Sequence, residues 1–298
     1  MVFDLNNIPD QSGKVAIVTG SNVGLGFSTA KYLVLNNAHV IIASRTPQKG
    51  LDAVAELKKM KPNAKVEFMQ LDLANSDSVR SFADAFIEKG LPLHLLVNNA
   101  GIAAVPHAKT VDGYEVTLGT NHLGTYLLTM LLLDTLKKSA PARVVTVSSL
   151  IANMSKANLN DVAGRNYEKS SMDVYGTSKL YNVMFAQELD NRVRADGVRS
   201  FVVQPGIAKS DMLRKTERSG ITTMMKGMKF MMQSSDKGAI STLYAATSDE
   251  VLATGSSRMY GPNMMNRGNT EARKIGSKDV TAANNKILWE KTRELVGV

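Results

Sequence analysis

Short apolar runs recur along the first two thirds of the chain, and stretches with helical spacing separate them. The runs are KVAIVT (14–19), HVIIAS (39–44), VEFMQLD (66–72), LHLLVNNAG (93–101), RVVTVSS (143–149) and VRSFVVQPG (198–206). Continuous apolar runs of this length are typical of strands that are buried on both faces, as in parallel sheets. The pattern therefore predicts six parallel strands.

Three of the intervening stretches carry helix signals. Apolar residues follow helical spacing in 26–37, and in 50–62 until Pro62 ends the pattern. The stretch 76–90 opens on Ser76 and Asp77, which can cap a helix, and ends in Gly90. Because strands alternate with helices, we expect an α/β fold: a doubly wound parallel sheet (Rossmann fold) with helices on both faces. In such a sheet, ligands bind where the strand order reverses.

A glycine-rich turn, TGSNVGLG (19–26), joins the first run to a helix that we expect to begin near Phe27. Gly20, Gly24 and Gly26 can adopt positive φ or let a ligand approach the backbone. A pyrophosphate could then contact the N–H groups at the start of the helix. Because a strand precedes the turn and a helix follows it, we interpret it as a dinucleotide-binding loop rather than a simple tight turn. We expect Ser21, Asn22 and Leu25 of this loop to contact the dinucleotide as well.

The composition fits one soluble domain over residues 1–298. No stretch rich in proline, glycine and serine divides the chain, although its 298 residues would suffice for about two domains. The first residues have no apolar signal-peptide core, and the most apolar stretch, 125–136, is too short for a membrane span and contains Asp134. The chain has no cysteine, which excludes disulfides and thiolate chemistry. We expect a cytoplasmic protein.

The net charge is +9, and six basic residues fall between 209 and 229. Basic residues do not alternate with aromatic ones as in nucleic-acid-binding motifs, so we expect no nucleic-acid partner and interpret the charge mainly as solubilising. The four histidines are scattered without metal-ligand spacing. We therefore expect no metal site.

The glycine-rich turn resembles the TGxxxGxG turn of the short-chain dehydrogenase/reductase family. Other stretches are similar to the same family, and to its branch with the retinol dehydrogenases and the WW-domain oxidoreductase: LDLANSDSVRSFADAF, LLVNNAGI, GTNHLGTYLLTMLLL, RVVTVSS and YGTSK. The resemblance is dense from about residue 13 to residue 210. It implies a nicotinamide cofactor and an oxidoreductase activity.

Tyr175 and Lys179 are four residues apart and would share one face of a helix. An ammonium beside a phenol lowers the phenol's pKa, so that the hydroxyl can exchange a proton with a carbonyl or an alcohol. The resemblance implies that both residues are catalytic and that Ser149, rather than Ser148, hydrogen-bonds the substrate oxygen. It also implies that Asn121 kinks its helix and holds a water that relays protons to the lysine. An asparagine satisfied within its own helix is the alternative.

The end of the second apolar run bears on the choice of cofactor. Sheets that bind NAD place an acid there for the ribose 2′-hydroxyl, whereas this chain has Ser44 and Arg45. A guanidinium can bind a 2′-phosphate, so we predict NADP(H), with an ordinary exposed arginine as the alternative.

The resemblance implies further contacts with the cofactor. They are Asp72 and Leu73 beside the adenine, Asn98 and Ala100 at the adenine-side ribose, Pro205, Gly206, Ile207 and Ser210 at the nicotinamide, and the catalytic Tyr175 and Lys179. Two of these positions have structural alternatives. Asp72 could instead cap the end of its strand, and Asn98 could serve only to stabilise the sheet.

The segment 211–237 contains six methionines, from Met212 to Met232. Flexible methionine side chains suit a lid over a bulky apolar substrate. A buried helix face, a helix packed on a partner and a peripheral contact with a lipid surface are the alternatives.

Together these features predict an NADP(H)-dependent enzyme that interconverts a small lipophilic carbonyl compound and its alcohol, with Tyr175 as acid and base. The alternative is a cofactor-binding regulatory or scaffold protein without turnover. The resemblance also implies a homodimer or tetramer through the helices that carry Asn121 and Tyr175, or a monomer, since the branch contains both.

Overall fold

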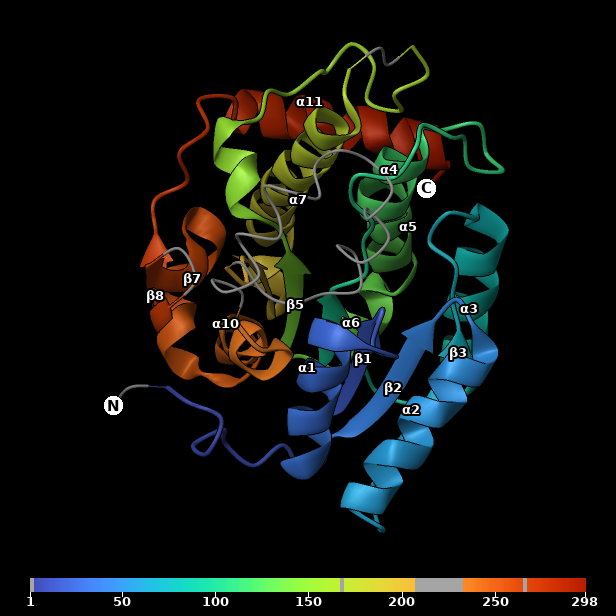
Figure 1. Cartoon of the computed structure of the whole chain (residues 1–298), viewed down its shortest axis with the longest axis vertical. Coiled ribbons are helices and arrows are strands. Elements are labelled where there is room, and N and C mark those ends of the chain that lie inside the picture. Colours follow the sequence, from blue (N-terminus) through green and yellow to red (C-terminus); the bar gives the residue numbers. More distant parts are fainter. Residues whose placement is uncertain (1–2, 167–168, 207–232, 265–266) are drawn as a thin grey trace.

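The computed structural model describes residues 3–166, 169–206, 233–264 and 267–298, which form an eight-stranded sheet covered by helices (Figure 1). The strand order is β3-β2-β1-β4-β5-β6-β7-β8. Neighbouring strands pair in parallel up to β7, and β8 pairs antiparallel with β7. The strands are β1 Val15–Thr19, β2 His39–Ser44, β3 Val66–Gln70, β4 Leu95–Asn98, β5 Ala142–Val147, β6 Val198–Val203, β7 Met259–Met264 and β8 Arg267–Arg273.

The first six strands are those that the apolar runs predict, and the predicted doubly wound sheet is confirmed. Every residue of β1 and β4 is buried, as expected for central strands of a parallel sheet. The apolar pattern does not predict β7 or β8. Gly261 and Pro262 interrupt the run of apolar residues in the sequence of β7, and the sequence of β8 contains no such run. Pairing with β6 places β7 instead, with Met259 opposite Val202.

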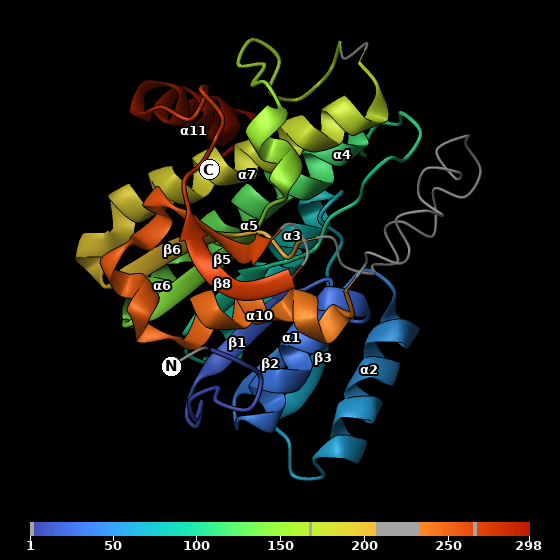
Figure 2. The ribbon, with the colours of Figure 1, turned by 60° about the vertical axis from the view of Figure 1, so that its left-hand side comes forward.

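Helices cover both faces of the sheet, as the alternation of elements predicts. α1, α2 and α10 pack on the face that receives Ala16 and Val18 of β1, whereas α3, α5 and α7 pack on the face that receives Val15 and Ile17. α11 packs outside α7 and α5 (Figures 1 and 2). The helices are α1 Gly24–Leu35, α2 Pro47–Met60, α3 Ser76–Glu88, α4 Val116–Leu118, α5 Gly124–Leu131, α6 Leu133–Lys138, α7 Ser171–Val193, α10 Ser235–Thr247 and α11 Ala282–Val296.

Two helices begin earlier than the sequence pattern suggests. α1 begins at Gly24 rather than near Phe27, so Gly24 and Gly26 belong to its first turn. α2 begins at Pro47, because the fixed φ of proline suits the first helical position.

The start of α3 also differs from the expectation. Asn75 caps this helix, since its side chain accepts hydrogen bonds from the N–H groups of Asp77 and Ser78 at 3.0 and 3.3 Å. The expectation that Ser76 and Asp77 are the caps is therefore wrong. Gly90 ends the helical stretch with a φ of +65°, as the sequence predicts.

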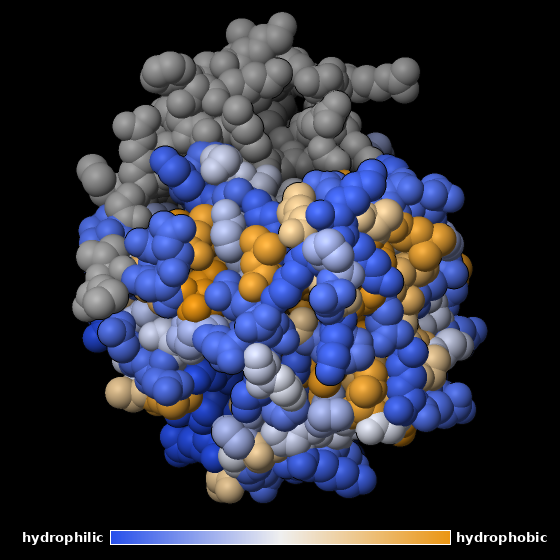
Figure 3. All heavy atoms as spheres, turned by 90° about the horizontal axis from the view of Figure 1, so that it is seen from below, coloured by the Kyte–Doolittle hydropathy of each residue, from blue (hydrophilic) through white to orange (hydrophobic). Residues whose placement is uncertain are grey.

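The surface of the described residues is mixed in character. Seen from below, hydrophobic side chains form small separate patches among hydrophilic ones (Figure 3). Within the described ranges, none of the helices combines the length and apolar character that crossing a bilayer requires.

Candidate active site

The strand order reverses between β1 and β4, and the turns that follow these two strands are joined there. Thr19 accepts hydrogen bonds at its hydroxyl oxygen from the N–H groups of Asn99 and Ala100, at 3.0 and 2.9 Å. The Asn99 amide donates in return to the Thr19 carbonyl at 2.8 Å. The sequence analysis does not single out Thr19 or Asn99, although both lie within the stretches that it quotes. Their contacts hold the glycine-rich turn against the end of β4.

The three glycines of this turn are needed for different reasons. Gly20 has a φ of +64°, and a side chain there would press on Ala100. Gly24 has a φ of +61°, and a side chain there would meet no atom of the described residues within 4 Å. A side chain at Gly26 would collide with the Gly20 carbonyl and the Asn99 amide. Backbone conformation therefore requires glycine at the first two positions, and close packing requires it at the third.

The first turn of α1 directly follows the glycine-rich turn. No side chain among the described residues caps it, and its N-cap is the apolar Val23. The Ser21 hydroxyl donates to the Val18 carbonyl at 2.6 Å and so shapes the turn. Asn22 and Leu25 are partly exposed beside it. The turn thus presents backbone N–H groups and the positive end of a helix, which suits a pyrophosphate.

Ser44 and Arg45 follow each other at the carboxyl end of β2. Ser44 is 4% exposed, and its hydroxyl has no hydrogen-bond partner in the described part of the chain. The Arg45 side chain is exposed. This end of β2 therefore offers a buried hydroxyl and a solvent-facing guanidinium.

The residues expected beside the adenine and its ribose have clear structural roles. Asp72 accepts a hydrogen bond from the Ala74 N–H at 3.0 Å, which favours the cap of the strand end, and Leu73 is buried in the core. Asn98 is buried and donates to the Thr129 hydroxyl at 3.0 Å, linking β4 to α5. Its amide oxygen has no partner among the residues described, so a second contact remains open to it.

Tyr175 and Lys179 lie one turn apart on α7, as the spacing predicts. The Lys179 ammonium is buried, donates to the Val147 carbonyl at the end of β5 at 3.0 Å, and lies 5.9 Å from the centre of the Tyr175 ring. Ser149 comes two residues after β5, and its side chain lies close enough to Tyr175 to lower the pKa of the tyrosine. The Ser148 hydroxyl instead donates to the Lys179 carbonyl at 2.7 Å. Ser149 is therefore the serine that faces the tyrosine.

Burial dominates the pKa of both α7 residues. It raises the pKa of Tyr175 above its usual value, and the nearby Ser149 side chain opposes this only in part. It lowers the pKa of Lys179 from 10.5 to about 8. The expectation that Lys179 lowers the pKa of Tyr175 is not met in the protein alone. The ammonium lies over the phenol ring and bonds a backbone carbonyl, while the hydroxyl is desolvated.

Asn121 lies in a π-helical turn, Gly119–Leu123, between α4 and α5. Its amide accepts from the Ile102 N–H at 2.8 Å and donates to the Ile102 carbonyl and the Ser178 hydroxyl, both at 2.9 Å. The asparagine is therefore bonded outside its own helix, and the helix is widened at this point. Ser178, which donates to the Tyr175 carbonyl at 2.7 Å, links it to α7.

Gly101 is a further residue that the sequence analysis does not assign. A side chain at this glycine would press on the Asn121 amide oxygen and the Lys179 ammonium, at 3.1 and 3.3 Å. Because Gly101 belongs to the NNAG stretch, its proximity to the candidate catalytic residues could be found only once the fold was known.

Pro205 and Gly206 follow β6. Gly206 has a φ of +70°, and its N–H donates to the Gln204 side chain at 2.7 Å. Gln233 donates to the Pro205 carbonyl. Ile207, Ser210 and most of the methionine-rich segment, 211–232, lie outside the described residues.

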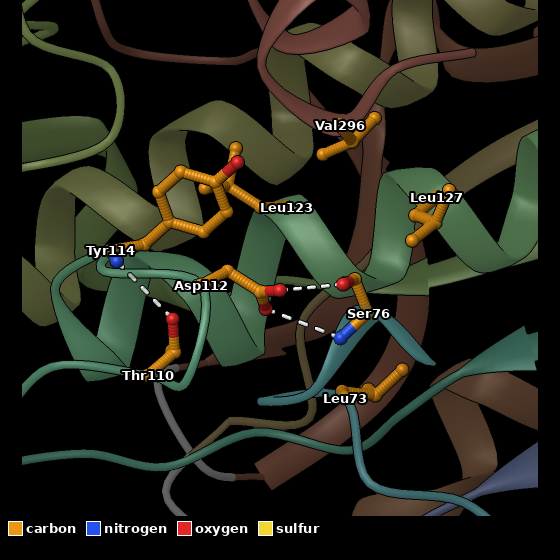
Figure 4. A pocket seen from close by; sticks show the side chains of 10 residues that line it. Leu73, Ser76, Thr110, Asp112, Tyr114, Leu123, Leu127 and Val296 are labelled. Atoms are coloured by element: carbon orange, nitrogen blue, oxygen red, sulfur yellow. Dashed lines mark hydrogen bonds between the residues drawn. The ribbon is translucent and has the colours of Figure 1, made fainter. Parts of the chain in front are cut away.

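A small hollow lies away from these residues, where the start of α3, the chain at 110–114, α5 and α11 meet (Figure 4). It has room for little more than a water molecule. Asp112 bonds the Ser76 hydroxyl at 2.5 Å and its N–H at 3.2 Å there. The hollow is thus a capped helix end and no part of the catalytic group. Across the described ranges, no three or more acidic or histidine side chains gather as a metal site would require.

Known proteins resemble this chain over most of its length. The sequence pattern of the family described as short chain dehydrogenase matches residues 14–220. Human retinol dehydrogenase 12 is 36% identical over 287 residues, covering 96% of this chain and 87% of that protein. Human polyprenol dehydrogenase is 37% identical over 300 residues, covering 97% of this chain and 87% of that protein.

A solved structure resembles the whole fold. An uncharacterized protein from Mycobacterium paratuberculosis superposes with a TM-score of 0.80 at 33% identity, covering 100% of this chain and 98% of that one. The chain belongs to the short-chain dehydrogenase family, as its motifs indicate. It is therefore an oxidoreductase that acts on CH–OH groups with a nicotinamide cofactor.

Proposed function

We propose that the protein is an NADP(H)-dependent oxidoreductase that interconverts an apolar ketone or aldehyde and the corresponding alcohol. The strongest support is the linked arrangement of the four catalytic candidates. Ser149 lies beside Tyr175, the Lys179 ammonium lies 5.9 Å from the centre of the Tyr175 ring, and Asn121 reaches the same turn of α7 through Ser178. Burial of a lysine costs free energy, so a buried lysine beside a tyrosine indicates use of the site.

Each catalytic group has its own task in this proposal. Tyr175 gives its phenolic proton to the substrate oxygen during reduction and takes it back during oxidation. Ser149 donates a hydrogen bond to the same oxygen and so orients it. We assign the Lys179 ammonium, which lies 5.9 Å from the centre of the Tyr175 ring, the task of stabilising the phenolate once the cofactor is bound. The nicotinamide cofactor supplies or accepts the hydride when it is bound.

The glycine-rich turn fits a dinucleotide. Among the described residues, nothing contacts the position of a side chain at Gly24, no side chain caps the start of α1, and the Ser44 hydroxyl has no partner. A bound pyrophosphate and ribose would use these features. The choice of NADP(H) rests on Arg45, which is exposed at the end of β2 where NAD-binding sheets place an acid. A guanidinium pairs with a 2′-phosphate through charge-assisted hydrogen bonds.

An apolar substrate is supported by the relatives and by the composition of one segment. Retinol dehydrogenase 12 and polyprenol dehydrogenase bear the names of long apolar alcohols. The segment 211–237 holds six methionines, and we assign it the role of a lid over such a substrate. Deletion of residues 211–232, which leaves α10 whole, should raise KM for apolar carbonyls and leave NADPH binding intact. Loss of NADPH binding would contradict the lid role.

The test of the function is NADPH consumption by the purified protein across a panel of apolar aldehydes and ketones, with NADH in parallel. Turnover that favours NADPH supports the proposal. Tight NADPH binding without turnover of any panel member would favour the regulatory alternative. Turnover with NADH preferred would contradict the cofactor assignment alone.

A further inference from the structure

The π-helical turn at 119–123 is held on two sides. Asn121 bonds Ile102 and Ser178, as described above. The next residue, His122, shares a hydrogen bond of 3.0 Å with the Thr292 hydroxyl, which belongs to α11. Both partners are buried, Thr292 fully and His122 to 1% exposure. The catalytic asparagine is therefore one residue from a contact with the last helix of the chain.

A π-turn inserts an extra residue into a helix and is less favourable than a regular α-helical turn, so surrounding contacts must hold it. His122 is enclosed by the rings of Tyr126, Tyr181 and Phe185, with centroids 5.2 to 6.4 Å away. Burial lowers the pKa of His122 to about 3, so the ring stays neutral at neutral pH. In the described part of the chain, Thr292 is the partner of its Nε2 atom.

Contacts with α7 fix the position of α11. Trp289 stacks on Phe185 of α7 at 5.9 Å with an angle of 16° between the rings. Asn285 donates to the Gln187 side chain of α7 at 3.0 Å. The position of Thr292 is thus determined by packing that does not involve the π-turn.

We propose that Thr292, acting through His122, is a positioning residue that holds the π-turn and thereby sets the hydrogen bonds of Asn121. The C-terminal helix is then part of the support of the catalytic site, 170 residues further along the chain. The inference rests on the proposed function for its effect on turnover, but its structural part does not need a known substrate.

The direct reporter is the Ile102 amide, because Asn121 accepts its hydrogen bond. We expect Thr292→Val, which keeps the volume and removes the hydroxyl, to speed hydrogen exchange of this amide about tenfold. Asn285→Ala is the matched control, since it breaks a polar contact of the same helix away from the π-turn. It should leave Ile102 exchange within about twofold of wild type. Thr292→Ser keeps the hydroxyl and should restore slow exchange.

Once a substrate is known, steady-state kinetics of the same variants provide a second test of the proposal. Thr292→Val should lower kcat about tenfold, whereas KM for NADPH should stay within about twofold, because the glycine-rich turn is untouched. Asn285→Ala should change neither. Equal effects of the two variants on Ile102, or wild-type exchange in Thr292→Val, would overturn the proposal. If Thr292→Val does not fold, Thr292→Ala takes its place with the same expected results. A wild-type protein without turnover would refute the function alone, since the exchange experiment still decides this inference.

Discussion

At the scale of single residues, burial of the Lys179 ammonium destabilises the folded protein. Its folded-state pKa of about 8 lies below the usual 10.5 because the ammonium is desolvated. Between these two pH values the unfolded chain binds more protons than the folded one, so stability should rise with pH through this window. Below pH 8 the lysine is protonated in both the folded and the unfolded chain, and burial of the charge destabilises the fold to its full extent. A charged lysine beside Tyr175 therefore lowers the free energy of unfolding at neutral pH.

Lys179→Met should therefore stabilise the fold while removing activity. At about 1.4 kcal/mol per pH unit, the gain at pH 7 is at most about 3 kcal/mol, reduced by the lost bond to the Val147 carbonyl. Urea unfolding at pH 7 and pH 10 measures it, and the gain should shrink at pH 10. A variant less stable than wild type at pH 7 would show that the charge is not costly there.

The proposed role of Arg45 in the choice of cofactor can be tested at the same scale. Arg45→Asp should weaken NADPH binding about 10- to 100-fold, because a charge-assisted pair is replaced by repulsion, and should leave NADH binding close to its wild-type value. Arg194→Asp is the control, since it makes the same charge change at an exposed residue that precedes β6, at the opposite end of the strands. Calorimetric titration of both variants with NADPH and with NADH measures these affinities. Equal weakening by the two variants would indicate only a long-range effect of charge.

At the scale of elements, the glycine-rich turn combines a local signal with a tertiary requirement. The spacing of its glycines predicts a ligand-binding turn between a strand and a helix, and Gly20 and Gly24 do have positive φ. The reason for Gly26 could not be predicted. It depends on the Asn99 amide, which reaches the turn only through the pairing of β1 with β4.

A pair of substitutions separates backbone strain from ligand binding. Gly13 and Gly24 both have positive φ, +78° and +61°, and a side chain would meet open space at either position. Gly24→Ala and Gly13→Ala should each cost about 1 to 2 kcal/mol of folding free energy. Only Gly24→Ala should weaken NADPH binding, by about tenfold or more, as measured by fluorescence titration. Similar affinities for the two variants would place the pyrophosphate elsewhere.

The other elements also divide into those that local sequence patterns predict and those that long-range contacts determine. Six strands, three helices and the Tyr175–Lys179 pair follow from short-range patterns, because burial on both faces and a four-residue spacing are visible in the sequence. The π-turn, β7 and β8 are not visible, since long-range contacts determine them. Thr19, Gly101 and Ser178 lie inside recognisable motifs, but their contacts depend on the pairing of distant elements.

At the scale of the whole molecule, α11 changes the expectation about assembly. The resemblance implies either a dimer or tetramer through the helices that carry Asn121 and Tyr175, or a monomer. In the structure α11 packs on these helices, and Trp289 contacts both Tyr126 of α5 and Phe185 of α7. A second copy could not use this part of the surface without displacing α11. We therefore expect that the protein does not dimerise through this face.

Trp289→Ala tests this arrangement. The wild-type chain should sediment as a monomer of 32.3 kDa, whereas the variant should lose about 3 to 5 kcal/mol of stability and self-associate through the uncovered aromatic rings. The intrinsic fluorescence of the single tryptophan in the wild-type protein reports on the attachment of α11. A wild-type dimer that the substitution dissociates would show that Trp289 belongs to an interface between chains.

The measurement that tests the central claim most directly is the rate of NADPH oxidation with the best apolar aldehyde or ketone of the panel, in wild type and in Tyr175→Phe. The substitution removes one hydroxyl from a half-buried ring and leaves the cofactor turn intact. The account predicts that kcat falls at least about 100-fold while NADPH affinity is unchanged, because the proton donor is lost. Turnover in the variant within a few-fold of wild type would contradict the assignment of Tyr175 as acid and base.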